Sequence, residues 1–380
     1  MIYLDNAATS YPKPESVYRA LDAFARQNLA NPGRAGHKMA LAAERALDDG
    51  RHLLNQFFHG QGPERFAFTL NGTDALNMAF KGVLGDGEHV VTTDLEHNSV
   101  SRPLRALEKD GRIALTRLKA DADGYVHPDD FRRAITPQTR LIALTHASNV
   151  LGTVQPVGEV GRIAREHDLL FVVDAAQTAG VVPIDVQAMH IDLLAFPGHK
   201  SLFGPTGTGA LYVGPRATLR AWREGGTGGD SSSETQPEQY PYFLEGGTPN
   251  VLGVAGLAAG IRYVQERGVE NIRAHENELI ERLRRRLEEI DGVTVYGGRD
   301  PSRRVSTLSF RSEALAAAEL GGILDQAFDV AVRPGLHCSP YIHRALGTFP
   351  DGTVRASAGA FNTVEDVDAL AAALGEILGY

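Results

Sequence analysis

Short apolar runs alternate with helix-like stretches along the middle of this chain, from about Arg65 to Val213. The runs are, in order, FAFTL, HVVTT, LIALTH, LLFVVDAA and LLAF. Helical patterns follow the first three runs, from Thr73, around Pro103–Glu108 and over Val157–His167. Strands that alternate with helices form a mostly parallel sheet with helices on both faces. The alternation therefore predicts an α/β fold with a large sheet domain.

The regions on either side of this core differ from it in composition. Residues 1–14 are rich in turn formers, and amphipathic helices are predicted over Glu15–Leu29 and Lys38–Phe58. Residues 224–249 lose all periodicity and are rich in Gly, Ser, Pro and Glu, which predicts a long loop.

After this loop the chain predicts a second, smaller unit. Helices are expected over Val251–Gln265 and Glu270–Ile290, and the strand runs VTVYG, VSTLSF and TVRASA follow. We therefore expect an N-terminal arm (1–14), a large domain (15–261) and a smaller α+β C-terminal domain (262–380).

Composition and charge narrow the class of protein. The chain has 380 residues, of which 43% are hydrophobic and 22% charged, as in ordinary globular proteins. A formal net charge of −9 and the lack of a Lys/Arg-rich block argue against nucleic acid or an anionic membrane as the main partner. No apolar run approaches the roughly 18 residues of a membrane span, and Met1–Asp5 lacks a basic leader, which predicts a cytoplasmic protein with small ligands.

Cys338 is the only cysteine of the chain. A single thiol forms no disulfide within the chain and no cysteine-cluster metal site. The 13 histidines show no HExxH or comparable spacing, so no metal site is predicted. Cys338 lies in the turn-rich segment RPGLHCSP, where Arg333 and His337 would favour the thiolate. A buried, inert cysteine is the alternative.

A lysine stands where the run LLAF stops, in the segment Pro197-Gly198-His199-Lys200. Pro197 and Gly198 end the strand, so Lys200 emerges at its carboxyl end, the edge where open α/β sheets bind ligands. In a partly desolvated pocket a lysine has a lowered pKa, and its neutral amine can attack a carbonyl. The alternative is an exposed lysine in a turn.

Polar residues also follow the other predicted strands. Gly72 and Thr73 open a helix after FAFTL, where their backbone N–H groups could hold a phosphate. Asp174 closes LLFVVD, where its carboxylate could hydrogen-bond a protonated ring nitrogen. Each of these residues alone could simply be a capping or turn residue. The same holds for three more polar residues near strand ends: His97, Asn149 and Gln177. Together they predict one pocket with complements for a phosphate, a ring and a carbonyl.

The motifs of the chain, in their order, resemble those of the class V branch of fold-type I pyridoxal-phosphate enzymes, and within that branch those of the cysteine desulfurases. The matching segments are YLDNAATS, NPGRAGH, FTLNGTDALN, LEHNS, THASNVLGT, VDAAQTAG, FPGHK, GPTGTGALYV, EGGTPN, HC and VRASAGAFNT. The resemblance implies a fold-type I transferase whose large domain binds pyridoxal 5'-phosphate.

The resemblance also implies roles around this cofactor. Lys200 would form the Schiff base, and Asp174 would pair with the pyridinium nitrogen. The remaining contacts would come from Gln177 to the ring hydroxyl, from His97 stacked on the ring, and from Gly72, Thr73 and His199 to the phosphate. Thr248 of EGGTPN would reach the phosphate of the neighbouring subunit, which implies a homodimer.

For the substrate, the resemblance implies that Asn149, Arg333 and Arg355 bind L-cysteine, with the Arg355 guanidinium on the carboxylate. Asn149 would also contact the cofactor. Cys338 would take the sulfur as a persulfide and release L-alanine. The compact segment around Cys338 is similar to that of the second desulfurase group, which passes sulfur to a dedicated acceptor protein.

Two positions depart from the family pattern. Pro197 stands where the family often has serine, so one phosphate hydroxyl is missing. Leu336 stands where related sequences often carry a histidine near the nucleophile.

Other functions fit part of this pattern. A class V aminotransferase or a related lyase would use the same cofactor and leave Cys338 incidental. A selenocysteine lyase would not require the thiol, because selenium leaves more readily than sulfur. A non-catalytic scaffold that retains the fold would have no use for Lys200.

Overall fold

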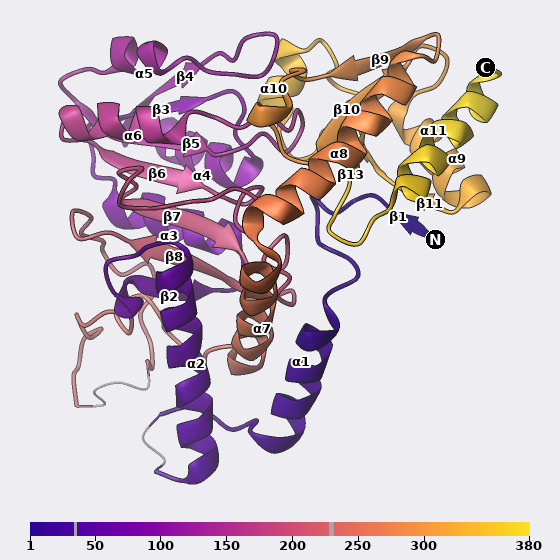
Figure 1. Ribbon diagram of the computed structural model, residues 1–380. Helices are drawn as coiled ribbons and strands as arrows, with labels where there is room; N and C mark the ends of the chain where they lie inside the picture. Colours follow the sequence, from indigo (N-terminus) through magenta and orange to yellow (C-terminus); the bar gives the residue numbers. More distant parts are fainter. Residues whose placement is uncertain (34–35, 228–231) are drawn as a thin grey trace.

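The computed structural model describes residues 1–33, 36–227 and 232–380 (Figure 1). Arg34 and Ala35 of the motif NPGRAGH and residues 228–231 of the predicted loop lie outside the described residues. Within the described ranges, no helix has both the length and the apolarity to cross a membrane. Nor does that part of the chain place three or more His, Cys, Asp or Glu side chains so that they could hold a metal ion.

A seven-stranded sheet forms the centre of the molecule. Its strands, in spatial order, are β2 (Phe66–Thr69), β8 (Gly209–Val213), β7 (Leu193–Pro197), β6 (Leu170–Asp174), β5 (Thr139–Thr145), β3 (Glu88–Thr93) and β4 (Ile113–Leu118). β8 runs antiparallel to both of its neighbours, and the other neighbouring pairs are parallel. The mostly parallel sheet predicted from the alternating runs is therefore confirmed.

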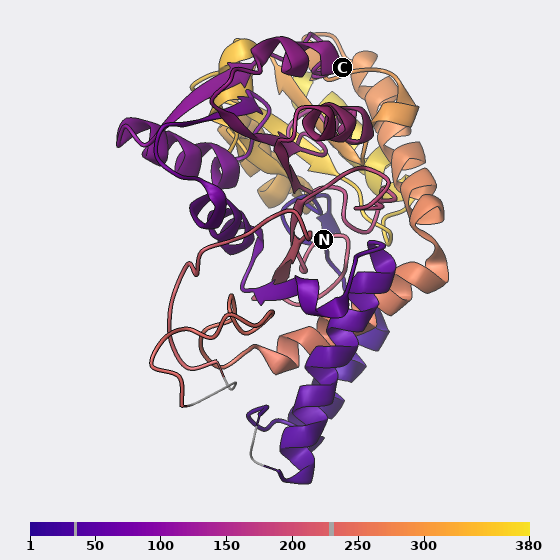
Figure 2. The same ribbon diagram turned by 90° about the vertical axis from the view of Figure 1, so that its left-hand side faces the viewer.

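Helices cover both faces of this sheet (Figure 2). One side carries α3 (Gly72–Val83) and α4 (Asn98–Lys109), and the other carries α2 (Lys38–Phe57), α6 (Val157–Glu166) and α7 (Val251–Arg267). Successive strand residues point to opposite faces, so Val172 packs in the core under α3 and α4 while Val173 packs in the core under α2 and α6. Because both faces are covered, these strands are continuous apolar runs.

Some elements near the sheet differ from the prediction. β4 is an edge strand with half-buried polar residues, and it was not predicted, nor was the short helix α5 (Pro128–Ala134). β8 returns antiparallel directly after β7 without a connecting helix. α4 begins at Asn98 rather than near Pro103, because His97 Nδ1 accepts a hydrogen bond from Ser99 N and caps the helix there.

The C-terminal part of the chain forms a second sheet. Its antiparallel strands, in spatial order, are β12 (Arg333–Gly335), β13 (Thr353–Ser357), β10 (Thr307–Ser312) and β9 (Val293–Tyr296). The helices α8 (Val269–Glu288), α9 (Ala317–Phe328) and α11 (Val364–Leu378) pack on it around a core that contains Leu283, Phe310 and Leu370. The N-terminal strand β1 (Ile2–Tyr3) pairs with β11 (Val330–Ala331), so the start of the chain lies beside this sheet (Figure 1).

The chain passes from the unit around the central sheet to the unit around the second sheet at the break between α7 and α8. Gly268 lies at this break with a φ of +84°, a left-handed backbone conformation that favours glycine. α7 packs against α1 (Glu15–Gln27) and α2, whereas α8 packs against α11. The domain boundary predicted at residue 262 lies within α7, and the division into arm, large domain and small domain stays a prediction.

Candidate active site

Lys200 lies just after β7, at the carboxyl edge of the central sheet. Pro197 is the last residue of β7, so the chain leaves the sheet at this point. The N-terminal segment holds the turn by its backbone: Ser10 Oγ donates to Lys200 O at 2.8 Å, and Thr9 Oγ1 donates to His199 O at 3.0 Å. The Lys200 side chain forms part of the wall of a cavity of about 210 Å³.

This cavity collects side chains from the N-terminal segment, from the central sheet and from the second sheet. Its lining includes Ala7, Asn71, Gly72, Thr73, His97, Ser99, Asn149, Asp174, Gln177, Pro197, His199, Lys200, Arg333 and Arg355. The structure thus brings together the site residues predicted from the sequence, with two exceptions. Thr248 and Cys338 are absent from the lining.

Burial lowers the pKa of Lys200 to about 8, and the positive charge of Arg355 contributes to the same effect. An exposed lysine has a pKa of about 10.4, so far more of the Lys200 amine is neutral near physiological pH. The neutral amine is the nucleophilic form.

Asp174 ends β6, the strand next to β7. Its Oδ1 accepts a hydrogen bond from Ala176 N at 2.9 Å. Burial raises the pKa of this carboxyl above its usual value. Asp174 takes part in none of the ion pairs found among the described residues. A cationic partner stabilises the charged form of such a carboxyl, and a protonated ring nitrogen would be one.

The N-terminus of α3 forms one end of the cavity. Asn71 Oδ1 accepts a hydrogen bond from Asp74 N at 2.9 Å and caps the helix. The backbone N–H groups of Gly72 and Thr73 belong to the first turn, which has no intrahelical acceptors, so they suit an anion. A Cβ on Gly72 would lie 3.2 Å from Pro197 Cδ, which favours glycine at this close approach.

Ser99 adds a hydroxyl to this end of the cavity. Its Oγ lies 2.7 Å from Thr73 Oγ1 and 2.9 Å from His97 Nδ1. Because His97 Nδ1 accepts from Ser99 N, the hydrogen-bond pattern assigns the ring proton to Nε2. Burial, followed by the charge of Lys200, lowers the pKa of His97 to about 3, so its ring is neutral and suited to stack on another ring. Sequence reasoning missed Ser99, although it follows His97 by two residues in LEHNS.

His199 and Gln177 both contact the N-terminal segment. His199 Nδ1 lies 3.0 Å from Thr9 Oγ1, and burial lowers the pKa of this histidine to about 4. Gln177 Nε2 donates to Ala7 O at 3.2 Å. The segment predicted only as an arm therefore forms part of the site.

Arg355 and Arg333 lie side by side, because they are directly opposite each other in the pairing of β13 with β12. The Arg355 side chain is 1% exposed; its Nη2 donates to Asp5 Oδ1 at 2.7 Å and its Nη1 donates to Asn149 O at 3.1 Å. Its Nε has no partner among the described residues. Asp5, which sequence reasoning also missed, thus fixes the guanidinium while leaving N–H groups for a carboxylate.

Cys338 lies on a strained turn between β12 and the short helix α10 (Pro340–Ala345). His337 and Cys338 have φ values of +49° and +60°, a conformation that costs energy for residues other than glycine. Asn149 holds both neighbours of the cysteine: its Nδ2 donates to His337 O at 2.6 Å, and its Oδ1 accepts from Ser339 Oγ at 2.7 Å. We call these three residues, Asn149, His337 and Ser339, the Asn149 clamp.

The thiol of Cys338 faces an arginine. Arg333 Nη2 lies 3.5 Å from Cys338 Sγ, and the Cys338 residue is half-buried. Because Arg333 and Asn149 both line the Lys200 cavity, the cysteine lies directly beside that cavity.

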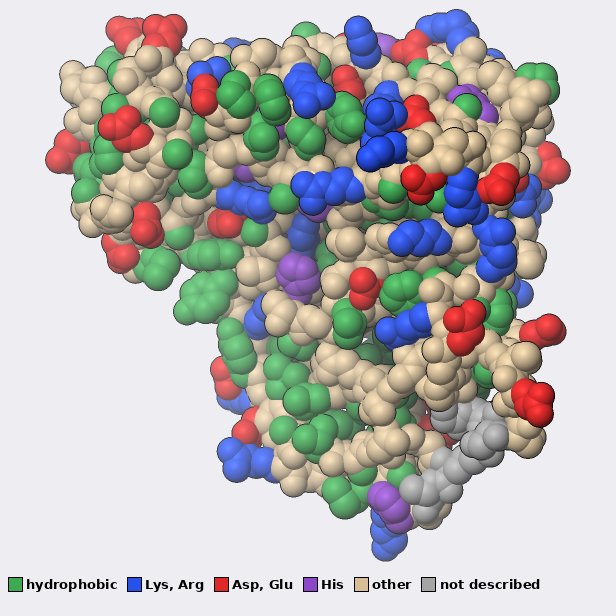
Figure 3. All heavy atoms as spheres, turned by 180° about the vertical axis from the view of Figure 1, so that it is seen from behind, with side chains coloured by type: hydrophobic (Ala, Val, Ile, Leu, Met, Phe, Trp, Pro, Cys, Tyr) green, Lys and Arg blue, Asp and Glu red, His purple; other side chains and the backbone are tan. Residues whose placement is uncertain are grey.

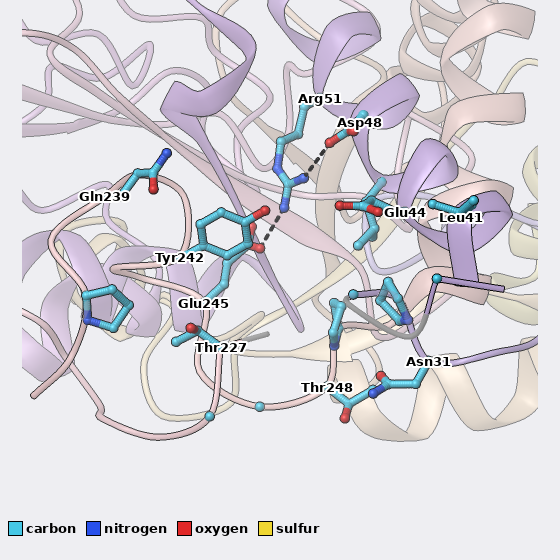
Figure 4. Close-up of a pocket in the computed structure, with 18 residues that line it drawn as sticks. Asn31, Leu41, Glu44, Asp48, Arg51, Thr227, Gln239, Tyr242, Glu245 and Thr248 are labelled. Atoms are coloured by element: carbon cyan, nitrogen blue, oxygen red, sulfur yellow. Dashed lines mark hydrogen bonds and ion pairs between the residues drawn. The ribbon is translucent and has the colours of Figure 1, made fainter. Parts of the chain in front are cut away.

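Thr248 lies in a different place. It lines a larger cavity of about 830 Å³ between α2 and the loop before α7 (Figure 4). There, Arg51 Nη2 lies 2.6 Å from Glu245 Oε2 and Arg51 Nη1 lies 3.4 Å from Asp48 Oδ1. The described residues that line this cavity include no lysine, histidine or cysteine, whereas Lys200, His97 and His199 line the smaller cavity.

The chain is similar to known proteins over its whole length. A sequence model described as Aminotransferase class-V matches residues 2–370. A probable cysteine desulfurase of Halalkalibacterium halodurans is 36% identical, over 100% of this chain and 94% of that protein. Another, of Methanothermobacter thermautotrophicus, is 37% identical, over 100% of this chain and 95% of that protein.

The same similarity holds in three dimensions. The apo structure of a cysteine desulfurase from Thermococcus onnurineus matches with a TM-score of 0.94 and 34% sequence identity, and the match covers 100% of this chain and 94% of that chain. The fold class and the resemblance inferred from the motifs are confirmed. The chain belongs to the aminotransferase class-V family, within its cysteine desulfurase branch.

Proposed function

We propose that this protein is a pyridoxal-phosphate-dependent cysteine desulfurase, which converts L-cysteine to L-alanine and keeps the sulfur as a persulfide on Cys338. The placement of the only cysteine of the chain carries this proposal. Asn149 lines the cavity of Lys200 and also holds the two neighbours of Cys338. A thiol is thereby held beside the cavity that Lys200 and Arg355 line.

The residues of the cavity fit each part of pyridoxal 5'-phosphate. The assignments are the α3 N-terminus with Gly72, Thr73 and His199 for the phosphate, Asp174 for the protonated ring nitrogen, Gln177 for the ring hydroxyl, His97 for the ring face and Lys200 for the aldehyde. The burial of Asp174 supports this fit, because a protonated ring nitrogen would stabilise the charged form of a carboxyl whose pKa burial raises. When bound, the cofactor withdraws electrons from the substrate and makes its bonds labile.

The chain's own residues then bind the substrate and move protons. Arg355, oriented by Asp5, would hold the carboxylate of L-cysteine, and Arg333 would lie next to it. The Lys200 amine would take the proton from Cα and return a proton to the product. Cys338 Sγ would attack the substrate sulfur, so that one C–S bond breaks and one S–S bond forms. Atoms balance, since L-cysteine and the thiol give L-alanine and the persulfide.

Ser99 would supply the phosphate hydroxyl that is missing at Pro197. Its Oγ lies 2.7 Å from Thr73 Oγ1, at the anion-binding end of the cavity. Pro197 packs on Gly72 instead, which keeps the first turn of α3 close to the end of β7.

The protein would act as a homodimer in which Thr248 of one subunit completes the phosphate site of the other. Thr248 lines another cavity than the Lys200 site of its own chain, which supports this arrangement. The compact segment around Cys338 favours transfer of the sulfur to an acceptor protein. A thiolate nucleophile needs a reducing compartment, which favours the cytoplasm.

Substitution of Cys338 by serine tests the proposed function. The variant should keep the visible absorbance of bound pyridoxal phosphate and should lose persulfide and sulfide formation from L-cysteine, because the hydroxyl cannot accept the sulfur. Persulfide can be trapped with an alkylating reagent and identified by mass spectrometry. Unchanged sulfide release would contradict the proposal, and turnover retained only with selenocysteine would identify a selenocysteine lyase.

A further inference from the structure

A patch of arginine and aromatic side chains lies beside Cys338, and the proposed reaction does not use it. We call it the arginine patch; it consists of Arg102 and Arg105 of α4, Arg117 of β4, Tyr341 and Arg344 of α10, and Phe349 just after α10. α4 lies on the rear of the molecule as Figure 1 is drawn, as the turned view in Figure 2 shows. On that rear face, Lys and Arg side chains gather in the upper half with hydrophobic side chains between them (Figure 3).

Side-chain contacts across three elements connect the members of the arginine patch other than Arg102, which lies about one turn before Arg105 on α4. The guanidinium carbon of Arg117 lies 4.7 Å from the centre of the Tyr341 ring, and that of Arg344 lies 5.7 Å from the same ring. Glu108 links the other side, with its Oε2 2.5 Å from Arg105 Nη1 and 3.8 Å from Arg117 Nη2. The patch therefore has a defined arrangement of rings and charges.

The arginine patch is positive on a protein that is negative as a whole. Its four arginines and the bridging Glu108 sum to +4 − 1 = +3, whereas the whole chain carries −9. Arg102, Arg105 and Arg344 are exposed, and Phe349 is 44% exposed with Arg344 stacked over it at 4.8 Å. Arginines around exposed aromatic rings are typical of protein interfaces. A positive surface favours a negative partner surface.

The patch borders the nucleophile on two sides. α4 begins at Asn98, whose N–H donates to Cys338 O at 2.7 Å. α10 begins at Pro340, two residues after Cys338 in the chain. Cys338 itself is half-buried, and both helices that carry the patch begin next to it. A protein that binds the arginine patch can bring its own thiol to the sulfur on Cys338.

We propose that the arginine patch is the docking surface for the sulfur-acceptor protein, and that this acceptor presents an acidic surface around its thiol. The inference rests on the proposed desulfurase function. In the transfer, the acceptor thiolate attacks the outer sulfur of the Cys338 persulfide. The bond from that sulfur to Cys338 Sγ breaks, a new S–S bond forms on the acceptor, and Cys338 leaves as a thiolate, so no external oxidant or reductant is consumed.

Short peptides can serve as probe acceptors for the holoenzyme. Three peptides of equal length, each with one cysteine and with acidic, neutral or basic flanking residues, are compared by the rate of L-alanine formation at saturating L-cysteine. At low ionic strength we expect the acidic peptide to react about tenfold faster than the neutral one, and the basic peptide to react more slowly. The difference should vanish near 1 M salt, where the screening length falls to about 3 Å.

Charge-reversed variants locate the effect. Arg102→Glu combined with Arg344→Glu should abolish the preference for the acidic peptide, whereas Arg285→Glu, at an exposed position of α8, should keep it. Dithiothreitol, an uncharged acceptor, should support equal L-alanine formation in all of these proteins. No preference for the acidic peptide in the unmodified enzyme, or a preference retained in the double variant, would overturn the proposed surface. Absence of L-alanine with dithiothreitol would instead contradict the desulfurase function.

Discussion

Lys200, His97 and His199 share one buried environment but differ in how they titrate. Burial lowers the pKa of each, to about 8 for Lys200, about 3 for His97 and about 4 for His199. Near neutral pH both imidazoles are therefore neutral, and the Lys200 amine changes charge just above this range.

This difference predicts a pH dependence for cofactor capture. Incorporation of pyridoxal phosphate into the apoprotein needs the neutral Lys200 amine, so its rate should rise about tenfold per pH unit below neutrality and level off near pH 8. Stopped-flow absorbance at a series of pH values measures this rate. A rate that still rises tenfold per unit up to about pH 10 would be that of an ordinary exposed lysine and would contradict the prediction.

Ser99 provides a second prediction at this scale. Removal of its hydroxyl in Ser99→Ala should weaken pyridoxal phosphate binding at least about tenfold, since a hydrogen bond to a charged group contributes about 1.5–3 kcal/mol. Ser99→Thr keeps a hydroxyl and should bind close to the unmodified protein. Equilibrium titration by absorbance gives both constants, and equal affinities in all three proteins would remove Ser99 from the phosphate site.

At the scale of elements, the position of Cys338 depends on segments distant in sequence. The loop after β5 supplies Asn149, and the start of α4 supplies Asn98, which donates to Cys338 O. A positive φ costs energy at Cys338, because this residue is not a glycine. These contacts offset that cost.

The Asn149 clamp can be tested through the thiol itself. Ser339→Ala leaves the buried Asn149 Oδ1 without its donor, at a cost of about 1–3 kcal/mol, so the turn should open more often. Alkylation of Cys338, the only cysteine, should become about tenfold faster, and persulfide formation should slow. Ser306→Ala removes another buried hydroxyl, which donates to Ala358 O, and should leave the alkylation rate unchanged. Equal alkylation rates in the Ser339 variant and the unmodified protein would contradict the clamp.

The same dependence on distant contacts limited what could be predicted from the sequence. The strand ends that carry Lys200, Asp174 and Thr73 were predicted because covered parallel strands are continuous apolar runs with polar residues where they stop. The roles of Asp5 and Ser339 come from pairing between segments far apart in the chain, which no local pattern encodes. β4 was missed because an edge strand mixes polar and apolar residues.

At the scale of the whole molecule, the proposed sharing of Thr248 between subunits predicts complementation between two defective subunits. The Lys200→Ala protein lacks the proposed Schiff-base amine and should be inactive, and Thr248→Ala should bind pyridoxal phosphate about tenfold more weakly. In a mixed dimer, one site combines the intact Lys200 of one subunit with the intact Thr248 of the other. Mixing should therefore raise desulfurase activity at limiting pyridoxal phosphate above the average of the two proteins. Sedimentation of the mixture would show whether it is dimeric. Activity equal to the average would contradict shared sites.

The first ten residues of the chain contact β11, Arg355 and the turn that carries Lys200. Met1 pairs with Asp329 and β1 pairs with β11, next to the second sheet, while Asp5 holds Arg355 of β13 and Ser10 holds the backbone of Lys200. The segment therefore connects the central sheet, which would carry the cofactor, to the second sheet, whose Arg355 would bind the amino acid. We expect changes within residues 1–10 to alter catalysis, although they remove none of the proposed reacting groups.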